Sequence, residues 1–259
     1  MVKTKKKYGQ HFLINVGIKE KIVQAIKDYI PEEDNLLEVG PGEGVLTKYL
    51  VEENYPLRLV EIDPDMIEIL NRDIPQLKPN QILAGDIIKM DSKSFFGDET
   101  FHLVGNFPYN VSSQLLFLMY ENKDQIPTMI GMFQKEVADR VVAPPGSKTY
   151  GILSVLLQAF YDCKRLFLVS RGSFNPPPKV DSAVILLQRN KTKQLECDEK
   201  LFKRVVKMAF SQRRKMLRNT LKSLLHETIQ TKEIFTKRPE HLSVQDFINI
   251  TIDIENNKV

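Results

Sequence analysis

A short stretch in the middle of the chain, Asn106-Phe107-Pro108-Tyr109, combines an amide, a rigid kink and an aromatic ring directly after an apolar run. This combination suits chemistry on an exocyclic amine. The nitrogen of a nucleobase amine is a poor nucleophile because its lone pair is delocalised, so a catalyst has to hold it by hydrogen bonds. The Asn106 oxygen and a backbone carbonyl before or at Pro108 can accept the amine protons, and Tyr109 offers a stacking face. The same residues also fit an ordinary strand-to-helix turn.

A glycine-rich turn, Glu38 to Gly44, follows the first apolar run. Glycines there let the backbone approach a ligand closely, in the crevice beyond the carboxyl ends of parallel strands. Glu61 comes 21 residues after Gly40, at the end of the second predicted strand, where a carboxylate can receive the two hydroxyls of a ribose. Dinucleotide and adenosyl sites both use this pair of features, and solvated acids beside a structural turn would leave the same pattern.

Four consecutive predicted strands end in a glycine or a polar side chain: Gly40, Glu61, Asp86 and Asn106. The carboxylate of Asp86 can accept a hydrogen bond from an adenine amine. Because the carboxyl ends of parallel strands meet at one edge of a sheet, these residues are expected to converge on one crevice. The pattern favours a site for a nucleoside cofactor.

The elements that have to position these residues alternate between strands and helices, which predicts an α/β fold with a parallel, doubly wound sheet. Apolar runs that suit buried strands are 36–40, 57–63, 81–86, 101–106, 128–134, 165–170 and 183–189, and helical segments include 46–53, 65–73 and 112–120. A Pro-rich loop joins the last two runs, so we expect a hairpin and an antiparallel edge there. The composition changes near residue 190, which predicts two domains, 1–190 and a small all-helical domain at 191–259.

Bulk properties are those of a soluble globular protein of 259 residues, with 42% hydrophobic and 27% charged residues. Cys163 and Cys197 have no metal-like spacing, so no metal site is predicted, and a reducing, cytoplasmic compartment fits. The basic residues are unevenly distributed. Residues 1–10 carry four Lys and residues 201–225 carry eight Lys or Arg, without acids, which leaves a net charge of −8 for the rest. Two such segments indicate a surface for a polyanion.

Motifs spread over most of the chain resemble one family, the small-subunit (16S) ribosomal RNA adenine N6,N6-dimethyltransferases, which has close relatives that methylate large-subunit rRNA. The matching segments are Tyr8–Leu13, Glu38–Gly42, Val60–Asp63, Gly85–Asp86, Gly105–Asn110, Phe133–Ala138, Phe174–Ser182 and Phe210–Asn219. The resemblance implies a Rossmann-like, seven-strand class I methyltransferase sheet with S-adenosyl-L-methionine as methyl donor. Phe107 stands where the family commonly has an aliphatic residue, and His11 stands where Asn is frequent.

The resemblance also implies roles for individual residues. The cofactor-binding set would be His11, Leu13, Gly40, Glu61, Asp86 and Asn106; the catalytic set Asn106, Pro108, Tyr109 and Phe174; and the RNA-binding set Arg213, Arg214, Lys215 and Arg218. Gly40 would lie under the methionine part, Glu61 would hold the ribose and Asp86 the adenine amine. Tyr109 and Phe174 would sandwich the target base.

The predicted function is therefore dimethylation of two adjacent adenines near the 3′ end of small-subunit rRNA during ribosome biogenesis, by a cytoplasmic monomer that binds the rRNA or the assembling subunit. One alternative is the same chemistry on large-subunit rRNA, of the macrolide-resistance type; the Gln212–Lys215 stretch fits the small-subunit enzymes better. A second alternative is a non-catalytic RNA-binding assembly factor, against which the intact Glu61, Asp86 and Asn106 speak. Hydride transfer by a dehydrogenase has no use for the Asn-Phe-Pro-Tyr stretch.

Overall fold

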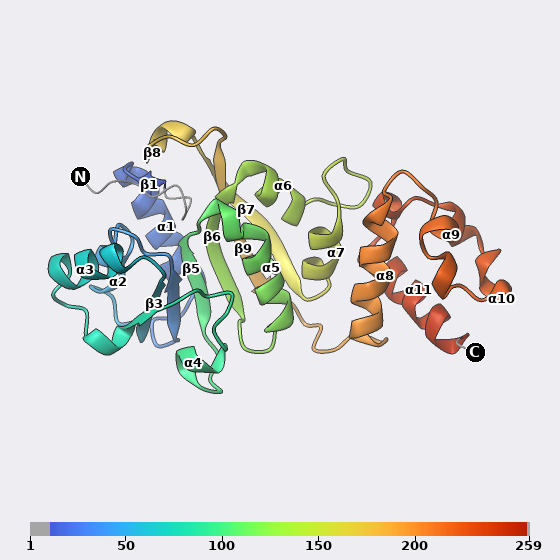
Figure 1. Ribbon diagram of the computed structural model, residues 1–259, viewed down its shortest axis with the longest axis horizontal. Helices are drawn as coiled ribbons and strands as arrows, with labels where there is room; N and C mark the ends of the chain where they lie inside the picture. Colours follow the sequence, from blue (N-terminus) through green and yellow to red (C-terminus); the bar gives the residue numbers. More distant parts are fainter. Residues whose placement is uncertain (1–10, 258–259) are drawn as a thin grey trace. The chain divides into compact units, whose positions relative to one another are not determined.

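The computed structural model describes residues 11–257, which form two compact units, drawn with all helices and strands in Figure 1. The first unit comprises the described residues up to Ala138 together with Asp162–Arg189, and the second comprises Asp139–Tyr161 and the described residues from Asn190 onward. The predicted boundary near residue 190 left 139–161 in the first domain. They group with the second unit because helix α7 (Ile152–Gln158) packs against helices α8 (Glu199–Ser211) and α11 (Val244–Asn256).

A seven-stranded sheet forms the centre of the first unit. In spatial order its strands are β4 (Ile82–Ala84), β3 (Leu57–Glu61), β2 (Leu36–Val39), β5 (His102–Asn106), β6 (Thr128–Gln134), β9 (Ser182–Arg189) and β7 (Tyr161–Val169). The pairs from β4 to β6 are parallel, and β9 is antiparallel to β6. The predicted parallel sheet and its antiparallel component are confirmed. Strands β2, β3 and β4 are added in one direction across the sheet, and β5 and β6 in the other. The switch point lies between β2 and β5, and doubly wound sheets bind their ligands at such a point.

Helices flank this sheet, and Figure 1 shows α1 and α3 on one side of β5 and α5 on the other. The helices of this unit are α1 (Val16–Tyr29), α2 (Thr47–Leu50), α3 (Pro64–Asp73), α4 (Lys93–Phe96) and α5 (Ser112–Glu121), with α6 (Lys135–Val141) at its border. Helix α1 buries Ile22 and Ile26 in the same hydrophobic cluster as Leu36 and Val104 of the sheet. Helix α2 is shorter than predicted because turns occupy the residues before and after it.

Short elements lie between these helices and strands. They are the 3₁₀ helices η2 (Pro79–Gln81), η3 (Tyr109–Val111) and η4 (Arg171–Ser173), and a two-stranded antiparallel sheet of β1 (Phe12–Leu13) and β8 (Phe174–Asn175). Strand β8 lies inside the Pro-rich loop for which the sequence predicted only a hairpin connection. Two-residue strands carry no periodic pattern, so this pairing could not be predicted from the sequence.

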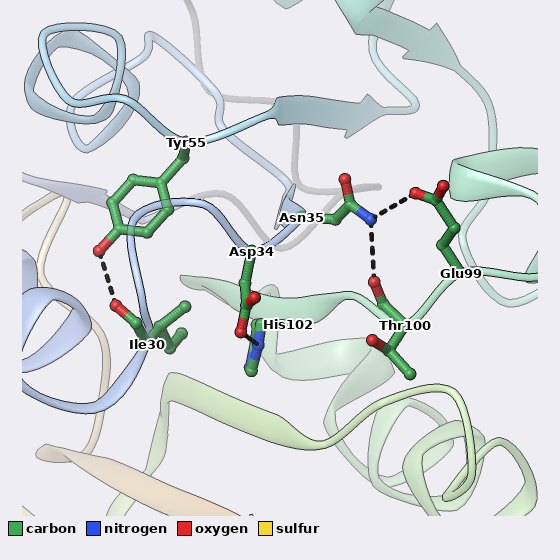
Figure 2. Close-up of polar contacts among 7 residues, drawn as sticks. All are labelled: Ile30, Asp34, Asn35, Tyr55, Glu99, Thr100 and His102. Carbon is green, nitrogen blue, oxygen red and sulfur yellow. Dashed lines mark hydrogen bonds and ion pairs between the residues drawn. The ribbon is translucent and has the colours of Figure 1, made fainter.

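Polar side chains hold the amino ends of β2 and β5 together, at the edge opposite the crevice (Figure 2). The Nε2 atom of His102 lies 3.0 Å from Oδ2 of Asp34. The Asn35 amide donates hydrogen bonds of 3.0 Å to Oε2 of Glu99 and to the carbonyl of Thr100. His102 is 5% exposed. Burial lowers the pKa of its imidazole, and the contact with Asp34 opposes this effect.

From Asn190 to Asn257 the described regular elements are all helical, as predicted. They are α8, α9 (Leu217–Thr220), η5 (Lys222–Leu224), α10 (Glu227–Gln230), η6 (Glu233–Thr236), η7 (Pro239–His241) and α11. Asp198 is the N-cap of helix α8 and its carboxylate accepts from the Leu201 amide, and a capping box between Ser243 and Asp246 precedes helix α11. Buried apolar residues of α8 and α11, such as Phe202 and Phe247, form the core of this unit.

Candidate active site

A cavity of about 470 Å³ lies at the carboxyl ends of the four strands β2, β3, β4 and β5 in the first unit. Its lining includes every residue that was predicted to bind the cofactor and three of the four predicted catalytic residues, since Asn106 belongs to both sets: His11, Leu13, Gly40, Glu61, Asp86, Asn106, Pro108 and Tyr109. The four strand ends therefore converge as expected. The volume falls in the range of small-molecule sites, and the walls combine apolar surface with a few polar groups.

The turn after β2 brings bare backbone to this cavity. Gly40 and Gly42 have φ angles of 66° and 56°, a region that favours glycine. A Cβ atom on Gly40 would lie 3.3 Å from Cδ of Pro108, and one on Gly42 would lie 3.3 Å from Cε1 of Phe12. The absence of side chains thus lets the turn pack closely against Phe12 and Pro108, while Gly40 and Gly42 themselves border the cavity.

Glu61, at the end of β3, is fixed by three backbone donors. Its Oε1 accepts from the amides of Ile62 and Asp63 at 2.9 Å, and its Oε2 accepts from the amide of Gly42 at 3.1 Å. The residue is 5% exposed. Burial raises the pKa of the carboxyl, while the backbone hydrogen bonds lower it. These bonds preorganise the carboxylate and leave Oε2 with one engaged lone pair, so it can receive a further hydroxyl.

Asp86 follows β4 and is half-buried at the same edge. Its Oδ1 accepts from the amide of Ile88 at 3.1 Å, and its Oδ2 lies 3.8 Å from Nζ of Lys89. The amide of Gly85, just before it, donates to the Glu61 carbonyl at 2.9 Å. The two acids that were predicted to hold a nucleoside therefore stand on adjacent strands and border one cavity.

The orientation of the Asn106 amide follows from its partner. Its Nδ2 donates to the carbonyl oxygen of His11 at 3.2 Å. Because a carbonyl can only accept, the nitrogen has to face His11, and Oδ1 is left as the acceptor for another donor. The carbonyl of Pro108 accepts from the Val111 amide at 3.2 Å. Within residues 11–257 the carbonyl of Phe107 has no such partner, so this oxygen, on a residue that also borders the cavity, is available to accept a hydrogen bond.

The N-terminal segment is fastened to the loop that contains Phe174. Strands β1 and β8 pair so that Leu13 is opposite Phe174, and the Ile14 amide donates to the Ser173 carbonyl at 2.9 Å. Nδ1 of His11 lies 2.9 Å from the carbonyl oxygen of Pro176. His11 therefore connects this loop to the Asn106 amide through its own backbone carbonyl.

Tyr109 lies beside His11, with ring centroids 5.4 Å apart and a tilt of 30°. Its hydroxyl is 2.6 Å from Oγ of Ser182 on β9, which fixes the ring. Burial raises the pKa of the phenol and the contact with Ser182 lowers it. Phe174 has a different environment: it is 3% exposed, belongs to the same hydrophobic cluster as Leu13 and does not line the cavity. Its predicted stacking role stays a prediction, and it requires the β8 loop to move.

Glu38 is a cavity residue to which the sequence analysis gave no role. It is 1% exposed and accepts a hydrogen bond of 2.7 Å from the Thr47 hydroxyl. Burial raises its pKa to about 7, the Thr47 hydrogen bond opposes this shift, and the nearby Glu61 adds to it. The available signal was a single acid inside an otherwise apolar strand.

The predicted RNA-binding residues lie in the second unit: Arg213, Arg214 and Lys215 between α8 and α9, and Arg218 within α9. Arg213 is half-buried and donates to the Ser147 carbonyl at 3.1 Å, so part of its role is structural. Arg214, Lys215 and Arg218 are exposed. The Lys-rich residues 1–10, and with them the start of the first motif, lie outside the described residues.

Residues 11–257 contain no group of three or more His, Cys, Asp or Glu side chains arranged to hold a metal ion. No helix in this range has the length and apolarity needed to cross a bilayer.

The strand order, the glycine turn after β2 and the acid at the end of β3 define a class I methyltransferase fold. The family model described as "Ribosomal RNA adenine dimethylase" matches residues 1–254, so the chain belongs to this family. The predicted family and fold class are confirmed.

Relatives and solved structures agree with this assignment. "Ribosomal RNA small subunit methyltransferase A" of Bacteroides thetaiotaomicron is 51% identical over 257 residues, covering 98% of this chain and 95% of that protein. The protein of the same name from Flavobacterium johnsoniae is 50% identical, covering 100% and 98%. A dimethyladenosine transferase from Plasmodium falciparum superimposes with a TM-score of 0.78 at 26% identity, covering 95% of this chain and 98% of that one. The 23S rRNA methyltransferase ErmE, at 23% identity and a TM-score of 0.66, covering 93% and 99%, shares the fold.

Proposed function

We propose that this protein transfers methyl groups from S-adenosyl-L-methionine to N6 of two adjacent adenines near the 3′ end of small-subunit rRNA, giving N6,N6-dimethyladenosines. The observation that carries the proposal is the Asn106 amide, which the His11 carbonyl orients so that its oxygen is presented beside a nucleoside-sized cavity. Membership of the ribosomal RNA adenine dimethylase family and the names of the relatives support the substrate.

The residues of the cavity fit the methyl donor. The backbone of Gly40 borders the cavity and would lie against the methionine part, and Oε2 of the fixed Glu61 carboxylate accepts from a ribose hydroxyl. Asp86 accepts from the adenine amine of the donor. When bound, S-adenosylmethionine supplies an electrophilic methyl group on its sulfonium, a chemistry that requires no metal from the protein.

The target adenine is held by the loop after β5. Oδ1 of Asn106 and the carbonyl of Phe107 accept the two protons of its N6 amine, which favours a pyramidal nitrogen with its lone pair available. The ring of Tyr109, fixed by Ser182, supports one face of the base. Catalysis is mainly positioning. Because the methylated nitrogen is cationic and strongly acidic, its proton leaves without a dedicated general base.

Affinity for RNA comes from the exposed basic residues of the second unit, Arg214, Lys215 and Arg218, through phosphate contacts. The proposal includes a monomer that acts in the cytoplasm on the assembling small subunit. Light scattering after size-exclusion chromatography tests the monomer.

The function is tested by incubating the protein with labelled S-adenosylmethionine and unmethylated small or large ribosomal subunits, and then mapping the modified bases by mass spectrometry. We expect two adjacent N6,N6-dimethyladenosines in small-subunit rRNA. Label confined to large-subunit rRNA, or none in either subunit from protein that binds the donor, would refute the proposal.

A further inference from the structure

The ring of Phe107 lies across a pair of glycines on two neighbouring central strands. Gly105 of β5 is the register partner of Gly131 of β6. A Cβ atom on Gly131 would overlap the ring and stand 2.6 Å from its Cδ2, and one on Gly105 would stand 3.0 Å from its Cε1. The ring is 1% exposed and also contacts Phe133, with centroids 5.1 Å apart. We call this arrangement of Gly105 and Gly131 the glycine seat of Phe107.

Glycine inside a central strand weakens the strand, so its presence calls for a local reason. Gly105 has two reasons, because its Cβ atom would also stand 2.6 Å from the Val39 carbonyl of the next strand. Gly131 has one: the three atoms nearest to its Cβ position all belong to the ring of Phe107. The ring and Gly131 therefore form a complementary pair, in which a large residue on the loop requires the smallest one on the strand.

This pair lies directly behind the reacting groups. Phe107 stands between Asn106 and Pro108, and all three residues border the cavity. Asn106 is tied to the His11 carbonyl, and Pro108 packs on the backbone of Gly40. The Phe107 carbonyl is itself an acceptor for the target amine in the proposed function. The depth of the ring in the glycine seat therefore sets the positions of Oδ1 of Asn106 and the Phe107 carbonyl relative to the glycine turn after β2.

We propose that Phe107 is a positioning residue for methyl transfer, and that Gly131 is the residue that permits it. Its ring contacts neither ligand and acts through the main chain of residues 106–108. A displacement of about 1 Å at reacting groups is enough to cost on the order of 100-fold in rate, whereas donor binding depends mainly on Gly40, Glu61 and Asp86. Disturbing the seat should therefore lower kcat and leave donor affinity nearly unchanged.

The test is a double-mutant cycle of Phe107→Leu and Gly131→Ala, with kcat measured on unmethylated small subunits and the Kd for S-adenosylmethionine measured by calorimetry. Each single variant is expected to lower kcat about tenfold or more, with Kd within about threefold of the parent. The double variant is expected to have a higher kcat than either single variant, because Leu leaves room for the added methyl group. Phe95→Leu is the matched control: Phe95 is fully buried beside Phe101 and does not line the cavity. It should lose stability but keep kcat within about twofold.

Because the role rests on the proposed function, the parent enzyme is measured first: an inactive parent refutes the function, whereas an active parent makes the cycle decisive. Single variants with parental kcat would overturn the positioning role. So would a double variant whose kcat is no higher than the value expected when the losses of the two single variants are multiplied. If Gly131→Ala does not fold, Phe107→Leu decides, since it introduces no overlap. Parental kcat in that folded variant overturns the inference, and a selective loss of kcat that Phe95→Leu does not share supports it.

Discussion

Glu38 makes the stability of this protein depend on pH in a direction opposite to that of most surface acids. Burial raises its pKa from 4.5 to about 7, so the folded state binds a proton that the unfolded state has already lost. The contribution of Glu38 to stability is therefore fully present below the unfolded pKa and is lost as the pH rises through about 7. A shift of this size corresponds to about 3 kcal/mol, of which about 2.5 kcal/mol falls between about pH 5 and pH 8.

Glu38→Gln removes this titration while keeping an acceptor for the Thr47 hydroxyl. The chain has no Trp, so urea unfolding is followed by circular dichroism without ligand at about pH 5 and pH 8. We expect the unfolding free energy of the parent, relative to that of the variant, to fall by about 2.5 kcal/mol over this range. Because both proteins carry every other titrating group, their difference isolates Glu38. Glu43→Gln, in the same turn but half-buried, is the control.

Parallel pH profiles for the parent and Glu38→Gln would refute the reasoning, since they would show that Glu38 titrates alike in the folded and unfolded states. A difference that grows in favour of the parent as the pH rises would reverse its sign and contradict the burial effect.

Three other predictions concern separate parts of the molecule. Because burial lowers the pKa of His102, its contribution to stability is present at high pH and is lost as the pH falls below about 6.5. His102→Asn should therefore reduce the fall in unfolding free energy, measured with urea, below about pH 6.5. An unchanged fall would show that His102 does not cause it. Phe174→Ala should lower kcat on small subunits by about 10-fold or more if the β8 loop opens to stack the base, and parental kcat in the folded variant would remove Phe174 from the base site. Replacing Arg214 and Lys215 by Gln should weaken RNA binding and reduce the slope of log affinity against log salt by about 2, with donor Kd as the control; an unchanged slope would place the phosphate contacts elsewhere.

The cavity residues at the strand ends were predictable from sequence because each depends on local rules. Gly40, Glu61, Asp86 and Asn106 each end a recognisable apolar run, and parallel topology brings such ends together. The helical nature of residues 190–257 was predictable for a similar reason, since the spacing of apolar residues is a local signal.

What escaped prediction depends on contacts between segments far apart in the chain. The pairing of β1 with β8, which buries Phe174 and orients Asn106 through His11, involves two-residue strands about 160 positions apart. The packing of α7 with α8 and α11 likewise cannot be predicted from composition. In the sequence Phe107 is only a departure from the family pattern, because the residue that accommodates its ring, Gly131, lies on another strand.

Asn106→Ala tests whether Asn106 holds the amine that is methylated. Single-turnover methyl transfer to unmethylated small subunits is measured beside the Kd for S-adenosylmethionine, with parent and variant at saturating donor. We predict a loss of at least about 100-fold in the rate of methyl transfer, with the Kd changed no more than about fivefold, because the amide acts on the reacting nitrogen. Methyl transfer at the parental rate by the folded variant would contradict the account.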